Sequence, residues 1–79
     1  MIPQEILLRV EAVFDNVFGA GVSFSSTLAR IDEEQWTSLK HVEFIIALEQ
    51  EFGVRFDGAD ATDMTSIAVV IERLQKRLS

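Results

Sequence analysis

Ser38 and His41 are the residues whose types and spacing first suggest chemistry. The histidine follows the serine by three residues, so on one helix a nucleophile and a base would lie about one turn apart. A serine hydrolase also needs an acid that orients the histidine and an oxyanion hole, and the sequence shows neither. Hydrolysis is therefore disfavoured, and we interpret His41 as a solvated surface side chain rather than a base or a ligand.

Metal chemistry has little support in the sequence. The chain has no cysteine and a single histidine, which excludes a Cys-ligated site and leaves too few ligands for a typical His-based zinc site. Asp57, Asp60 and Asp63 recur at every third position, but this spacing lacks the alternating ligands and the terminal glutamate of an EF-hand loop. We therefore expect neither a metal site nor a disulfide.

Ser38 stands at the start of the helix around which the rest of the chain is organised. Thr37 or Ser38 can cap this helix with a side-chain oxygen, and no residue from Leu39 to Phe52 interrupts it. Gly53 can adopt the left-handed conformation that ends helices. From these residues alone, a helix cap is the simplest role for Ser38.

The apolar residues of this helix form two stripes on opposite sides. With Leu39 at zero and an advance of roughly 100° per residue, Val42 and Ile46 fall within about 60° of it. Glu43, at about 40°, and Glu49, at about 280°, flank this first stripe. One stripe is enough for the core of a small protein, so the first stripe is a candidate docking surface unless a neighbouring helix covers it. The second stripe, between about 140° and 240°, comprises Phe44, Ile45, Leu48 and Phe52.

Two further helices follow from the same periodicity. An amphipathic helix of about four turns begins at Pro3 and ends at Gly19 and Gly21. A last helix is capped by Thr65 or Ser66, and the basic residues near its end suit the helix dipole. Its apolar face comprises Ile67, Val70, Ile71, Leu74 and Leu78.

The connections complete the expected architecture. Residues 19–36 form a long loop, for which we predict a short helical turn at Asp32–Gln35. The polar segment 57–63 has room for one short helix, whereas Val54–Phe56 is too short for a strand. The predicted fold is all-α: a small four-helix bundle of three main helices and one short helix, with a long loop between the first two. The expected anchors of that loop are Phe24, Leu28, Ile31 and Trp36.

Length and charge narrow the function classes. A chain of 79 residues makes one domain, 1–79, and buries only about 60% of its unfolded surface, which leaves little room for an enclosed catalytic pocket. The 13 acidic and 7 basic residues give a net charge of −6, which repels nucleic acid and favours basic protein partners. No apolar run reaches the roughly 20 residues of a membrane span, and the start lacks a signal peptide. We expect a free-standing, monomeric, cytoplasmic protein.

A resemblance to a known family adds to this interpretation. Thr37-Ser38-Leu39, continued through Val42 to Gly53, resembles the Asp-Ser-Leu region and second helix of acyl carrier proteins. The likeness extends through Val54–Phe56 to Thr65-Ser66-Ile67 and is clear from about Trp36 to Leu74. In that family the serine carries a 4′-phosphopantetheine arm, and the protein is not itself an enzyme.

The resemblance implies a specific role for Ser38. It would carry the arm covalently and hold an acyl or related group as a thioester, as in fatty acid and polyketide biosynthesis. A phosphodiester at this helix start would meet unpaired backbone N–H groups and the positive end of the dipole. The implied partners are a phosphopantetheinyl transferase and basic enzymes that load, modify and transfer the group, docking on Leu39, Val42, Glu43, Ile46 and Glu49. The alternative is an unmodified adaptor of the same fold.

The chain departs from the family pattern around the serine. Thr37 stands where the family usually has aspartate, Trp36 replaces a small residue, and Lys40 with His41 follows where an acidic residue is usual after Ser-Leu. These departures favour a dedicated pathway, such as polyketide, peptide-hybrid or modified-sugar biosynthesis. We interpret Trp36 as a loop anchor. The expected cargo is short or polar and stays outside a bundle filled by Phe14, Phe18, Phe44, Phe52 and Phe56.

Overall fold

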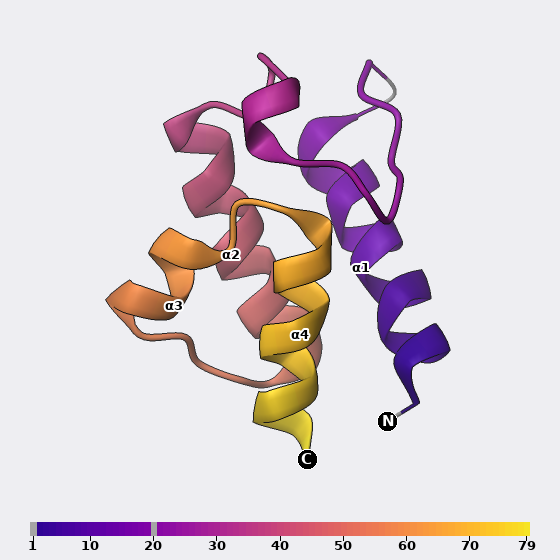
Figure 1. Ribbon diagram of the computed structural model, residues 1–79, viewed down its shortest axis with the longest axis vertical. Helices are drawn as coiled ribbons and strands as arrows, with labels where there is room; N and C mark the ends of the chain where they lie inside the picture. The colour runs from indigo at the N-terminus through magenta and orange to yellow at the C-terminus, as the bar shows by residue number, and fades with distance from the viewer. Residues whose placement is uncertain (1, 20) are drawn as a thin grey trace.

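The computed structural model describes residues 2–19 and 21–79, and these form four α-helices (Figure 1). This confirms the predicted all-α fold of three long helices, one short helix and a long connection between the first two. The bounds are α1 Pro3–Phe18, α2 Ser38–Phe52, α3 Gly58–Asp63 and α4 Ile67–Leu78, with a 3₁₀ turn, η1, at Arg30–Asp32.

Local signals set the helix ends. Pro3 is the first residue of α1, and Gly53 ends α2 in the left-handed conformation with φ 65°. The cap of α2 is Thr37, whose Oγ1 accepts a bond of 3.2 Å from the backbone N–H of Lys40. The cap of α4 is Ser66, whose side chain accepts from the N–H of Val69. Of each predicted pair of capping residues, the structure therefore selects one.

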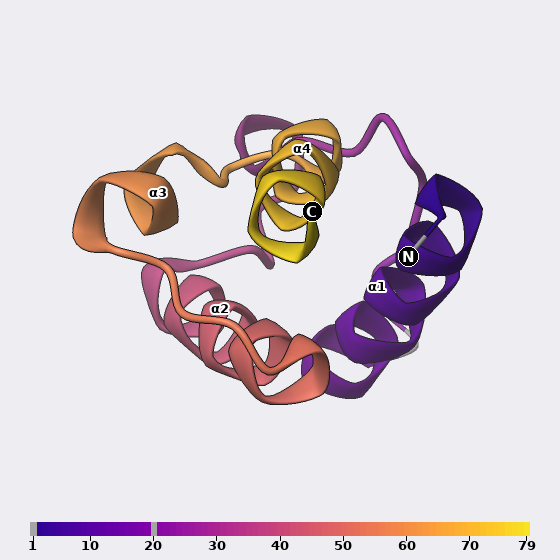
Figure 2. The ribbon, with the colours of Figure 1, turned by 90° about the horizontal axis from the view of Figure 1, so that it is seen from below.

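The three long helices surround a common core. Helix α1 runs opposite to α2 and α4, and α3 lies to one side, against α2 and α4 (Figures 1 and 2). Phe14 of α1 is fully buried, and its ring contacts the rings of Phe18, Phe24, Trp36 and Phe44. These edge and stacked contacts add to the area burial that stabilises the fold.

The long connection is anchored differently from the prediction. Trp36 is 2% exposed, and Phe24 and Leu28 pack against the core, but Ile31 is 93% exposed. The helical turn lies at η1, two residues before the predicted Asp32–Gln35. The backbone N–H of Arg30 donates to the carbonyl of Thr65 at 2.8 Å, which holds η1 against the approach to α4. In that position the side chain of Ile31 is left in solvent, so the prediction for Ile31 was wrong.

The aspartates of the α3 segment are ion-pair partners. Asp60 pairs with Arg73, with Nε 3.1 Å from Oδ1, and also with Arg77. Asp63 pairs with the same Arg73 at 3.2 Å. The pKa of Asp60 lies below its ordinary value, and the hydrogen bond from Arg77 is the largest cause of this lowering. These pairs tie α3 to α4, and the described residues contain no acidic or histidine cluster suited to a metal ion.

Candidate functional site

Ser38 is exposed at the first position of α2, after the long connection. Because Thr37 caps the helix, the hydroxyl of Ser38 is not committed to that role. Instead its Oγ lies 2.9 Å from Nη2 of Arg30, which donates to it. An accessible hydroxyl at a helix start, beside a cation, suits an acceptor for an anionic group.

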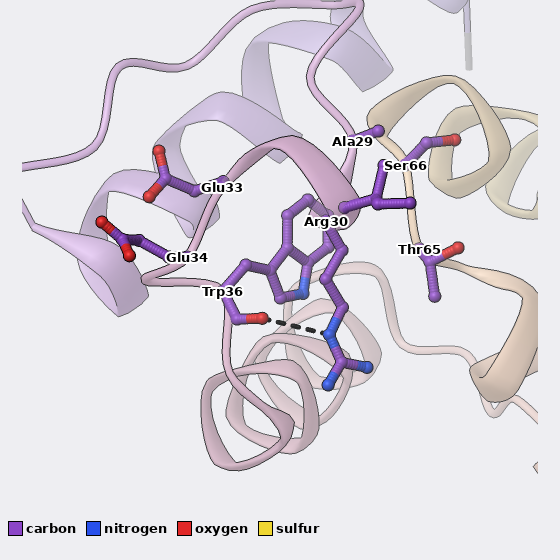
Figure 3. A pocket seen from close by; sticks show the side chains of 8 residues that line it. Ala29, Arg30, Glu33, Glu34, Trp36, Thr65 and Ser66 are labelled. Carbon is purple, nitrogen blue, oxygen red and sulfur yellow. Dashed lines mark hydrogen bonds between the residues drawn. The ribbon is translucent and has the colours of Figure 1, made fainter.

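Arg30 reaches Ser38 from η1 and was not identified from the sequence. Its Nε donates to the backbone carbonyl of Trp36 at 3.0 Å, which fixes the plane of the guanidinium (Figure 3). Arg30 is the sole basic residue in the segment 19–36, and this feature of the sequence could have identified it as a candidate. The spacing of eight residues from Ser38 does not by itself predict contact, because the approach depends on the position of η1.

A hollow of about 630 Å³ lies between η1 and the start of α4. Figure 3 shows that the side chain of Arg30 borders it, with the ring of Trp36 behind. Arg30 therefore connects this hollow to the hydroxyl of Ser38. The lining residues are Ala29, Arg30, Ile31, Glu33, Glu34, Trp36, Thr65 and Ser66.

His41 is buried, which corrects its interpretation as a solvated surface residue. The indole N–H of Trp36 donates to its Nδ1 at 3.0 Å, and its Nε2 lies 2.8 Å from the carbonyl oxygen of Ala61. A neutral imidazole that carries its proton on Nε2 satisfies both contacts. Both nitrogens are thus engaged in structural bonds, and the hydroxyl of Ser38 bonds to Arg30 rather than to His41.

The sequence held the signal for this burial. At roughly 100° per residue, His41 falls at about 200° from Leu39, which is the middle of the second apolar stripe. That stripe faces the core, where Phe44 and Leu48 are fully buried. His41 shares their side of the helix, and its hydrogen bonds offset the cost of burying a polar ring.

The first apolar stripe faces solvent. The exposed fractions are 68% for Leu39, 54% for Val42 and 48% for Ile46, so within the described residues no other helix covers them. Glu43 is exposed beside them and pairs with Lys40 at 3.4 Å. Glu49 also has a structural role, because its carboxylate accepts a 2.8 Å hydrogen bond from the backbone N–H of Phe56. The five residues thus form one face, with Glu49 partly buried at its edge.

Comparison with known proteins gives one curated relative and no matching family model. An acyl carrier protein of Thermotoga maritima is 28% identical over 76 residues, which are 95% of this chain and 94% of the relative. The chain is homologous to an acyl carrier protein. This confirms the resemblance found in the sequence, and it agrees with the expectation that the chain is a carrier and not an enzyme. The match spans all four helices rather than the serine motif alone.

Two further observations concern the setting of this carrier-like chain. Among the described residues, no helix has both the length and the apolar character needed to cross a membrane.

Of the loop anchors, Trp36 is the most deeply buried. It stands two residues before Ser38, so the connection that leads to the serine is fixed to the core immediately ahead of it.

Proposed function

We propose that this protein is an acyl carrier protein that holds its cargo as a thioester on a 4′-phosphopantetheine arm attached to Ser38. The observation that carries the proposal is the exposed hydroxyl of Ser38 at the start of α2, which does not cap the helix, in a chain matched over 95% of its length by an acyl carrier protein. The arm supplies a terminal thiol, which forms the thioester. The chain supplies the attachment point and the surface that partner enzymes recognise.

The surroundings of Ser38 fit the attached group. A transferase would join Ser38 Oγ to the β-phosphorus of coenzyme A, with release of adenosine 3′,5′-bisphosphate and the hydroxyl proton. The resulting phosphodiester anion would lie at the positive end of the α2 dipole. The neutral Thr37 places no negative charge beside it. The indole of Trp36 is directed into the core, away from the exposed serine.

The partner surface in this proposal is the exposed face formed by Leu39, Val42, Glu43, Ile46 and Glu49. Apolar residues at its centre and carboxylates at its margins favour enzymes with a basic docking surface, beginning with the phosphopantetheinyl transferase. The departures at Trp36, Thr37 and Lys40 favour a dedicated biosynthetic pathway. The cargo is proposed to be short or polar.

The modification is tested by incubating the protein with coenzyme A and a broad-range transferase, followed by intact mass and fragmentation. We expect a single adduct, on Ser38. The Ser38→Ala variant should accept nothing while its melting temperature stays close to that of the wild type, because Thr37 provides the cap. Ser25→Ala, in the exposed loop, is the matched control and should be modified normally. An adduct elsewhere, or none with several transferases, would favour the unmodified adaptor.

The docking face needs a test that leaves the fold intact. Reversing the charge of Glu49 would break its bond to Phe56, so we choose Glu43→Lys combined with Glu49→Gln, which keeps an acceptor. We expect transfer to this variant to slow at low salt and to approach the wild-type rate at high salt. Glu5→Lys combined with Asp15→Asn, both exposed on α1, changes the net charge by the same amount and is the control. Equal rates for the two variants at low salt would refute the assignment of this face.

A further inference from the structure

Arg30 is a cation directed at Ser38 rather than at a carboxylate. The ion pairs found among residues 2–19 and 21–79 use Arg9, Lys40, Arg73 and Arg77, and none uses Arg30. Asp32, Glu33 and Glu34 follow within four positions in the chain, yet the guanidinium contacts the Trp36 carbonyl and the Ser38 hydroxyl. A protein of net charge −6 thus directs a cation to a neutral acceptor.

The geometry of this contact leaves room for an anion. Arg30 is partly buried, and its Nε is fixed by Trp36, so the fork is already oriented before any group is attached. A guanidinium has five N–H donors in a plane that matches phosphate oxygens, and these two contacts require only two of them. In the phosphodiester, phosphorus would be bonded to Ser38 Oγ, so the free phosphate oxygens would lie two bonds beyond the atom that Nη2 already contacts.

We propose that Arg30 binds the phosphodiester formed at Ser38 and so fixes the root of the phosphopantetheine arm beside η1. This inference rests on the proposed function. In the unmodified protein the guanidinium holds the neutral hydroxyl, and after modification it pairs with a charge. The modified form therefore gains a contact between η1 and α2 that the unmodified form has only weakly, and this gain decreases with salt.

The experiment compares unmodified and modified wild type with Arg30→Gln, Arg30→Lys and the control Arg55→Gln. Arg55 is exposed beyond the far end of α2 and enters none of the ion pairs among the described residues, so both glutamine variants lose one charge. We expect modification to raise the melting temperature of the wild type and of Arg55→Gln by about 3 °C at low salt. Arg30→Gln should lose this gain, and Arg30→Lys should keep part of it.

Two spectroscopic readouts separate this inference from the carrier function. On modification, the side-chain Nε–H resonance of Arg30 should shift while that of Arg55 stays in place. The ³¹P resonance should differ between wild type and Arg30→Gln. The inference is wrong, and the carrier function stands, if the wild type is modified but the Arg30 Nε–H resonance does not shift, and Arg30→Gln changes neither the ³¹P resonance nor the gain in melting temperature. If the wild type takes no arm from several transferases, both fail.

Discussion

The bonds of His41 predict a large effect of one substitution. In His41→Leu, a side chain of similar size would occupy the same buried position without polar atoms. The indole N–H of Trp36, 2% exposed, would lose its acceptor, and the Ala61 carbonyl would lose its partner at 2.8 Å. The substitution thus removes the link between the end of the long connection, α2 and α3.

The magnitude follows from what remains unpaired. A buried donor without a partner costs about 1–3 kcal/mol. The Ala61 carbonyl is at a partly exposed residue and can turn to water, so its loss adds less. We therefore expect a loss of about 2 kcal/mol in the free energy of unfolding, and a melting temperature lower by roughly 8–16 °C for a domain of this size.

Urea and thermal unfolding of the wild type, His41→Leu, Trp36→Phe and the double variant test this reasoning. Gln50→Leu, exposed on the same helix, controls for adding leucine to α2 and should change stability by less than about 0.5 kcal/mol. The double variant should be less destabilised than the sum of the single variants, because each removes the same bond. An additive double variant, or a His41→Leu as stable as Gln50→Leu, would refute the buried hydrogen bond.

Three further outcomes are expected. The pKa of Asp60 is lowered from its ordinary value near 3.8, chiefly by the hydrogen bond from Arg77, so its stabilisation is present above that value and is lost as pH falls through the lowered pKa. Below about pH 4, the melting temperature of Asp60→Asn should therefore fall less steeply with decreasing pH than that of the wild type. Because the net charge is −6, added salt should raise the melting temperature, and a salt-independent value would contradict charge-limited stability. Loading an eight-carbon acyl group should leave the NMR shifts of Phe14 and Phe44 nearly unchanged, since a buried chain would have to displace these fully buried rings.

The helices and the two faces of α2 could be predicted from the sequence because their signals are local. Pro3, Thr37, Gly53 and Ser66 act within one turn of their own positions. Apolar spacing likewise separates the exposed Leu39 stripe from the buried one. Such features depend on residues three or four apart, which the sequence displays directly.

The errors arose where the type of a residue was given more weight than its position, or where distant segments decide. Histidine is usually exposed, but the angular position of His41 put it in the buried stripe. Ile31 is apolar, yet η1 is held by backbone bonds to the segment before α4, which leaves that side chain in solvent. Arg30 meets Ser38 for the same reason. No local pattern in residues 19–36 specifies the pairing with Thr65 and Ser66.

In the sequence, Trp36 and His41 are two separate departures from the family pattern, but in the structure their side chains act together. They are hydrogen-bonded to each other, and each has a second partner: Arg30 on the Trp36 carbonyl and Ala61 on the His41 ring. A small residue at position 36 would leave His41 Nδ1 without its donor in the core, and an apolar residue at 41 would leave the indole without its acceptor. The two positions therefore depend on each other, and both act on the site because the carbonyl of Trp36 orients the guanidinium that contacts Ser38. The placement of the serine is thus determined by a chain of contacts from α3 through α2 to η1, outside the three residues that identify it.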